Sequence, residues 1–242
     1  MTRIAAKTDI GRVRATNQDS MRFGMLTEDT AYAIVCDGMG GHNGGDIASA
    51  TATEVIEAQL QKGYRKDMSE MSLKSLITTA IINANAKIYS KAAENPELNR
   101  MGTTVDVIVS SEQNVYLGHV GDSSIFQVTP TSLVKLTKDH TVVQQLLEEG
   151  EISQEVAMNH PQKHYITKAV GVDSSIVPDF DCVQLEYKDM IFMCSDGLTN
   201  YLDLDTAHKV LIKNKPQKAV NLLVDMVNEN GGGDNVTVVL IY

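Results

Sequence analysis

The sequence predicts an α+β fold: a β-sandwich of two antiparallel sheets, flanked on each side by paired antiparallel helices. Two observations predict it. Strand-like and helix-like segments alternate in blocks rather than one by one, and the long helix-like segments come in pairs between strands. Of the 242 residues, 43% are hydrophobic and 21% are charged, which is typical of a globular protein with a core. We therefore expect one domain over residues 1–242.

The amino-terminal block contains three short strand-like segments, at 2–8, 21–26 and 31–36, which we interpret as a meander. Two helix-like segments follow them. Apolar residues recur at helical spacing over 46–61 and, more clearly, over 72–93. The pattern predicts two long amphipathic helices that are neighbours in the sequence.

The second β block contains four closely spaced strand-like segments separated by turn residues. They are expected at 103–110, 114–120, 124–129 and 132–137. Such short spacing favours antiparallel hairpins. Two short and more polar helices are expected next, at 141–149 and 153–160, as an excursion from the core.

The carboxy-terminal block repeats the alternation of strands and helices. Strands are expected at 180–187, 190–195 and 236–242, and helices at 204–213 and 216–229. Pro216 suits the first turn of its helix, and a glycine run follows the end of that helix. The block order is typical of paired helices packed outside antiparallel sheets.

Charge and cysteine content narrow the partners and the compartment. The formal net charge of -10 argues against a nucleic acid or an anionic membrane as a partner. The first twenty residues lack the apolar stretch of a secretion signal, and no apolar run approaches the roughly 18 residues of a membrane span. The three cysteines favour reduced thiols over disulfides. We expect a cytoplasmic monomer.

Four aspartates stand at strand ends. Asp37, Asp122 and Asp196 follow apolar strands in YAIVCDGMGG, YLGHVGDSS and MIFMCSDGLTN, and Asp234 precedes the last strand in GGGDNVTVVLIY. For any one of them, the turn of a hairpin is the simpler explanation. That explanation fails for Asp37 and Asp196, because helix-like sequence follows both.

Clustered carboxylates repel one another unless a cation lies between them, and oxygen ligands favour Mg²⁺ or Mn²⁺. The sequence therefore predicts two such ions held chiefly by Asp37, Asp196 and Asp234. Two ions a few ångströms apart can hold a phosphoryl group and activate a bridging water or hydroxide, which is a route to phosphate ester hydrolysis. Arg14 is the best candidate to orient the phosphate, since guanidinium matches phosphate oxygens.

Seven ordered motifs resemble those of the metal-dependent PP2C family of protein serine/threonine phosphatases, in particular its compact bacterial members. They are RATNQD at 14–19, VCDGMGGH at 35–42, MGTT at 101–104, HVGDS at 119–123, TKDHT at 137–141, CSDGLT at 194–199 and GGGDNVTVV at 231–239. The resemblance implies a β-sandwich between helix pairs. It also implies hydrolysis of phosphoserine and phosphothreonine on proteins, opposing a cognate bacterial Ser/Thr kinase.

The resemblance assigns roles to the site residues. Asp37 would bridge the two metal ions, the carbonyl oxygen of Gly38 would bind one of them, and Asp196 and Asp234 would hold the other. Asp19 would act through a water, and Asp122 would bind a third ion together with Asp196. Arg14 would hold the substrate phosphate, and Asn235 is a further candidate site residue. Residues 143–172 would form a flap beside the cleft.

Two positions differ from the family pattern. Many members have histidine where this chain has Met39, and that histidine is a favoured general acid. His42 is a candidate for this role, although a lone histidine in a glycine-rich turn is more often structural. Ser124 stands where the family commonly has arginine after Gly-Asp-Ser, which removes a salt-bridge partner near Asp122.

Two other functions stay open: a phosphatase of small phosphorylated metabolites, and a pseudophosphatase that only binds phosphoproteins. A nucleotide loop is excluded, because Asn43 occupies the third glycine position of G-x-G-x-x-G and no GK[ST] motif is present. His160 and His164 lie four residues apart but lack a third zinc ligand nearby, so we interpret both as part of the flap surface.

Overall fold

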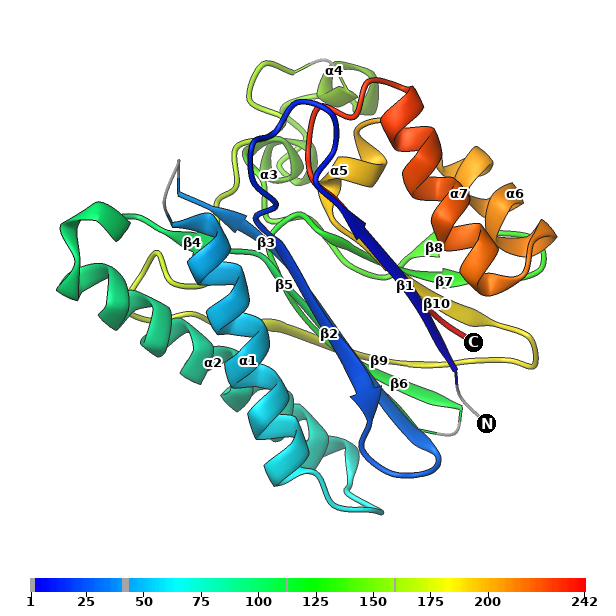
Figure 1. The fold of residues 1–242 in the computed structure, drawn as a ribbon, viewed down its shortest axis with the longest axis horizontal. Helices are drawn as coiled ribbons and strands as arrows, with labels where there is room; N and C mark the ends of the chain where they lie inside the picture. The colour runs from blue at the N-terminus through cyan, green and yellow to red at the C-terminus, as the bar shows by residue number, and fades with distance from the viewer. Residues whose placement is uncertain (1–2, 41–43, 112, 159) are drawn as a thin grey trace.

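The strands form two antiparallel sheets that pack face to face (Figure 1). The structure, a computed structural model, describes residues 3–40, 44–111, 113–158 and 160–242. The five-stranded sheet has the order β1 (Ile4–Asp9), β11 (Val236–Ile241), β10 (Met190–Cys194), β7 (Ser124–Val128) and β8 (Leu133–Lys135). The six-stranded sheet has the order β2 (Asp19–Met25), β3 (Thr30–Met39), β5 (Val105–Ser111), β6 (Asn114–Val120) and β9 (Asp179–Gln184), with β4 (Gly102–Thr103) paired to β3.

Two pairs of helices cover the outer faces of the sandwich (Figure 1). The six-stranded sheet is covered by α1 (Gly45–Gly63) and α2 (Glu70–Glu94), and the five-stranded sheet by α6 (Leu204–Lys213) and α7 (Pro216–Glu229). The described residues also form four short helices: η2 (Pro96–Leu98), α3 (Val142–Glu148), α4 (Gln154–Met158) and α5 (Asp196–Thr199). The arrangement confirms the predicted fold class.

Side-chain hydrogen bonds mark where several helices begin. Ser69 accepts from Ser72 N–H at the start of α2, and Asp203 accepts from Thr206 N–H at the start of α6. Such caps satisfy amide groups that have no partner inside the helix. Pro216 occupies the first turn of α7, as the sequence predicts.

The core consists of three apolar layers, and the central strands contribute to two of them. In β3, Ile34 and Cys36 pack beneath α1 and α2, whereas Ala33 and Val35 face the other sheet. Successive side chains of a strand point to opposite faces, so a strand with a helix layer on one side and a sheet on the other must be apolar throughout. This explains why AIVC is an uninterrupted apolar run.

The predicted meander is wrong, because the first three strands do not lie in one sheet. Strand β1 pairs with β11, whereas β2 and β3 belong to the other sheet. The second β block is likewise divided: β5 and β6 form a hairpin in one sheet, and β7 and β8 a hairpin in the other. Local patterning shows that a segment is a strand, but the pairing between distant segments decides its sheet.

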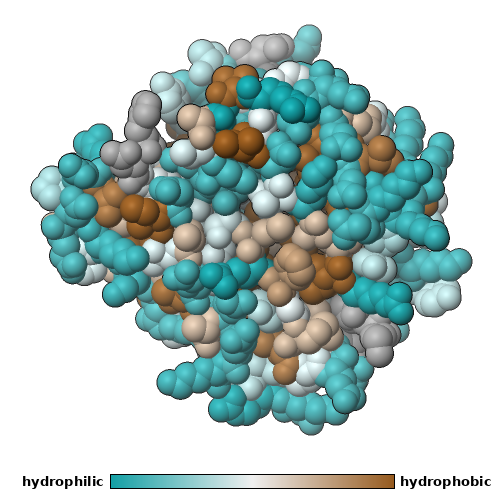
Figure 2. Space-filling view, in the orientation of Figure 1, coloured by the Kyte–Doolittle hydropathy of each residue, from teal (hydrophilic) through white to brown (hydrophobic). Residues whose placement is uncertain are grey.

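The face of the molecule drawn in Figure 2 is mostly hydrophilic around its rim, with hydrophobic groups in separate patches and in a broader area near its centre. The cysteines Cys36, Cys182 and Cys194 are free thiols. Among the described residues, every helix is too short or too polar to cross a membrane.

Candidate active site

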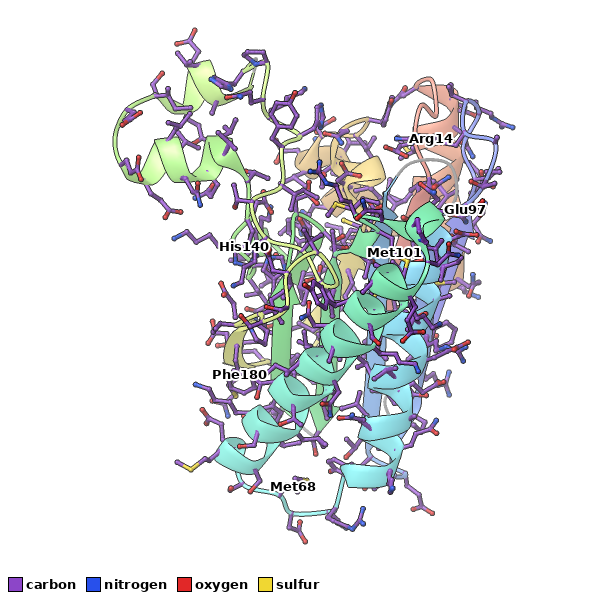
Figure 3. The ribbon with its side chains drawn as sticks, turned by 90° about the vertical axis from the view of Figure 1, so that its left-hand side faces the viewer. Arg14, Met68, Glu97, Met101, His140 and Phe180 are labelled. Carbon is purple, nitrogen blue, oxygen red and sulfur yellow. The ribbon has the colours of Figure 1, made fainter. Side chains whose placement is uncertain are left out.

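A cleft of about 1030 Å³ opens at one end of the sandwich and gathers residues from distant parts of the chain. Figure 3 shows Arg14 on one side of this end and the two flap helices, α3 and α4, on the other. The predicted ligands that line the cleft are Asp37, Gly38, Asp122, Asp196 and Asp234. Tertiary structure therefore brings together carboxylates that lie up to almost 200 residues apart.

The sequence predicts Asp37 in a turn after its strand, but Asp37 lies within β3. The strand continues to Met39, because β2 and β4 pair with its last residues. Asp37 stands directly opposite Asp19 in the β2–β3 ladder, and Asp37 N–H donates to Thr104 Oγ1 at 2.9 Å. Burial, followed by the charge of Asp19, raises the pKa of Asp37 well above its ordinary value.

Asp19 lies beside the cleft rather than in its lining. Burial raises its pKa to about 7, although hydrogen bonds to Thr237 and Ser195 act in the opposite direction. Ser195 Oγ donates to Asp19 Oδ2 at 2.8 Å and accepts from Thr237 N–H at 3.0 Å. Sequence reasoning missed the fully buried Ser195; the only signal for it is a hydroxyl side chain between an apolar strand and Asp196.

Asp196 begins α5 immediately after β10. Burial and then the charge of Asp234 raise the pKa of Asp196, and Asp196 Oδ2 accepts from Asn200 Nδ2 at 3.0 Å. The glycines after Asp37 and Asp196 allow close backbone approach rather than a hairpin turn. A Cβ on Gly38 would collide with the carbonyl of Gly45, and one on Gly197 with the carbonyl of Asn235.

Asp122 follows β6, in a loop that opens with Gly121 at φ +115°. Burial and then Asp196 raise the pKa of Asp122 to about 8. Gly121 N–H donates to His140 Nδ1 at 3.0 Å, and His140 N–H donates to Gly121 O at 2.7 Å. The loop of Asp122 is thus tied to the chain that leads into α3.

Asn235 connects the amino-terminal loop of the cleft to the start of β11. Its Oδ1 accepts from Gln18 N–H at 2.8 Å, and its Nδ2 donates to Ile10 O at 2.9 Å and Thr16 O at 3.0 Å. The same loop carries Arg14, whose Nη2 donates to Asp234 Oδ2 at 2.8 Å. Arg14 therefore lines the cleft and lies against a carboxylate.

The two departures from the family pattern have different surroundings. Met39 lies at the end of β3 and lines the cleft, whereas Ser124 is buried in β7 opposite Cys194. His42, the candidate general acid, lies outside the described residues. From the flap, residues 163–166 line the cleft.

The carboxylates suit hydrated divalent cations. Asp19 Oδ1 is buried and has no hydrogen-bond partner among the described residues, and mutual repulsion among the aspartates would be relieved by positive charge. In the described parts of the chain, no group of three or more His, Cys, Asp or Glu side chains is placed to hold a metal ion by itself. Mg²⁺ usually keeps several waters and binds through only one or two carboxylates. The donor set thus fits Mg²⁺ or Mn²⁺ better than a structural zinc ion.

Comparison with known proteins agrees with this chemistry. The family model described as Protein phosphatase 2C matches residues 11–214. The serine/threonine phosphatase stp of Listeria welshimeri is 33% identical over 237 residues, which are 97% of this chain and 93% of that protein.

Two solved structures extend the likeness to the fold. The Streptococcus agalactiae serine/threonine phosphatase superposes with a TM-score of 0.92 at 33% identity, covering 100% of this chain and 99% of the other. The catalytic domain of the serine threonine protein phosphatase PstP, in complex with two manganese ions, superposes with a TM-score of 0.84 at 30% identity, covering 99% and 97%. The chain belongs to the metal-dependent protein phosphatase 2C family and is a protein serine/threonine phosphatase that acts on phosphorylated proteins.

Proposed function

We propose that this chain hydrolyses phosphoserine and phosphothreonine on proteins with two Mn²⁺ or Mg²⁺ ions. Asp37 and Gly38 would bind the first ion. Asp196 and Asp234 would hold the second ion, which Asp37 would also bind. The observation that carries the proposal is the gathering of these carboxylates in one cleft, where burial and repulsion raise the pKa values of Asp37 and Asp196. When bound, such ions activate a water molecule and offset the charge of the phosphate.

The protein's own residues would position the substrate and the ligands. Arg14, half-exposed at the edge of the cleft, would hold the phosphate oxygens with its guanidinium. Ser195 fixes the orientation of Asp19, which would act through a water. Asp122, which shares the cleft with Asp196, would add a third ion site.

The test is Mn²⁺-dependent hydrolysis of a phosphothreonine peptide and of 4-nitrophenyl phosphate. We expect Asp37→Ala and Asp234→Ala to lose nearly all turnover and to weaken Mn²⁺ binding in calorimetric titrations. Asp225→Ala is the matched control, because Asp225 is an exposed carboxylate that pairs only with Lys7 among the described residues. No turnover in the unchanged protein, or full turnover in Asp37→Ala, would contradict the proposal.

The proposal extends to organisation and partners. Strands β1 and β11, from opposite ends of the chain, pair with each other, which supports one domain over residues 1–242 with a flap at 143–172. The free thiols support a reducing compartment such as the cytoplasm. A cognate Ser/Thr kinase would supply the phosphoproteins, and the enzyme would act as a monomer. Unchanged phosphothreonine levels in cells without the protein would contradict the kinase link, and light scattering would measure the monomer's mass.

A further inference from the structure

Departure of a serine or threonine oxygen requires a proton, because the free alkoxide is a strong base. The identity of the proton donor is thus a question that rests on the proposed function, the hydrolysis of phosphoserine and phosphothreonine. Among the described residues that line the cleft, His164 is the one histidine. Histidine is the side-chain type that exchanges a proton near neutral pH, whereas the guanidinium of Arg14 keeps its protons. Within the described residues, the cleft thus contains one imidazole suited to proton transfer.

His164 lies where the flap meets the metal-binding carboxylates. It lines the main cleft and also a smaller adjoining cavity of about 220 Å³, and both include Asp122 and Asp196 in their walls. Burial and then Asp234 raise the pKa of Asp196, and the charge of His164 acts in the opposite direction, so the ring is close enough to influence that carboxylate.

The His164 side chain is exposed and makes no hydrogen bond or ion pair with any residue in the described ranges. Its ring is therefore not committed to a structural contact. His160, four residues earlier, differs: its Nδ1 accepts from Gln162 N–H at 3.2 Å, and it lines neither cavity.

Backbone contacts fix the segment that carries His164 relative to the Asp122 loop. Val142 N–H donates to Tyr165 O at 3.0 Å, and an isolated antiparallel bridge joins Thr141 to Ile166. Two residues before Val142, His140 exchanges hydrogen bonds with Gly121. Figure 3 places His140 at the root of the flap, below its two helices. The position of His164 at the cleft therefore follows from the fold.

We infer that His164 is the general acid that protonates the departing serine or threonine oxygen. As a water oxygen forms its bond to phosphorus, the bond from phosphorus to the substrate oxygen breaks, and its electron pair stays on that oxygen. The oxygen takes a proton from a ring N–H of His164, leaving a neutral imidazole that regains a proton from solvent. Among the described residues, the charged groups that share the smaller cavity with His164 are Lys163 from the flap, Asp122 after β6, Asp139 before α3 and Asp196 from α5. The main cleft adds Arg14, Asp37 and Asp234.

The basicity of the leaving group separates this role from a structural one. A nitrophenolate departs without a proton, whereas a threonine alkoxide does not. With Mn²⁺ present, we expect His164→Ala to lower kcat on a phosphothreonine peptide by about 100-fold. On 4-nitrophenyl phosphate, the same variant should lower kcat by about 10-fold or less. For the unchanged enzyme, kcat on the peptide should decrease as the pH becomes alkaline. This decrease should be absent in His164→Ala.

Two further variants and a rescue complete the test. His164→Gln keeps a polar side chain without an exchangeable ring proton and should lose as much peptide activity as His164→Ala. Added imidazole should restore part of the peptide activity of His164→Ala. His160→Ala is the matched control and should keep the same ratio of the two activities as the unchanged enzyme.

The outcomes distinguish this inference from the proposed function. If the unchanged protein hydrolyses neither substrate with Mn²⁺, both fail. If 4-nitrophenyl phosphate is hydrolysed, equal losses on the two substrates in His164→Ala, or no loss on either, overturn the role of His164 alone. Selective loss of peptide activity in His42→Ala with none in His164→Ala would do so as well.

Discussion

Asn235 offers a test of how the cleft is built. Its side chain makes three hydrogen bonds to the loop of residues 10–18, which carries Arg14 and leads into Asp19. Only 4% of Asn235 is exposed, so these bonds are shielded from water. We expect Asn235→Ala to loosen this loop, which would lower both the stability of the protein and the turnover of phosphate esters.

The magnitude follows from the contacts that are removed. An intramolecular hydrogen bond contributes about 1 kcal/mol net, so three of them amount to about 3 kcal/mol. Part of this is recovered, because much of the loop borders solvent and its carbonyl groups can bind water once the side chain is gone. We therefore expect a loss of about 2 kcal/mol in the free energy of unfolding, which a domain of ordinary stability survives.

Urea unfolding followed by circular dichroism measures the loss, and kcat/KM for a phosphothreonine peptide measures the effect on the loop. Asn221→Ala is the control, because Asn221 is an exposed asparagine of α7 whose contact, with Gln217 at 3.3 Å, lies on its own helix. A loss below about 0.5 kcal/mol in Asn235→Ala, or an equal loss in both variants, would refute the reasoning.

Two more predictions concern the groups beneath the Asp122 loop. Asp106 and His119 form a buried pair at 2.6 Å, so Asp106→Ala should cost about 3 kcal/mol or more in urea unfolding, and a cost below about 1 kcal/mol would contradict this. Burial lowers the pKa of His140 from 6.5 to about 4, so the unfolded chain binds more protons between these values. The contribution of His140 to stability should therefore rise with pH across that window, whereas the raised pKa values of the buried aspartates act in the opposite direction. Stability should rise less, or fall more, with pH in His140→Gln than in the unchanged protein; identical slopes in the two proteins would contradict this.

The sequence predicted the long helices and most strands well, because each buries a face whose period can be read locally. It also predicted Asp37, Asp122, Asp196 and Asp234 as site residues, since each lies at or next to a strand end. Helix α5 was not predicted, because its four residues are too few to show a helical period.

The sequence by itself determined the long helices, most of the strands, and which carboxylates are candidates for metal binding, because hydrophobic period and side-chain chemistry are local properties. Only the tertiary structure decided that β1 pairs with β11, that Ser195 orients Asp19, and that His164 borders the cleft rather than only the flap surface. Those relations join residues far apart in the chain. They depend on how two sheets pack and on where the flap is anchored, which no local pattern records.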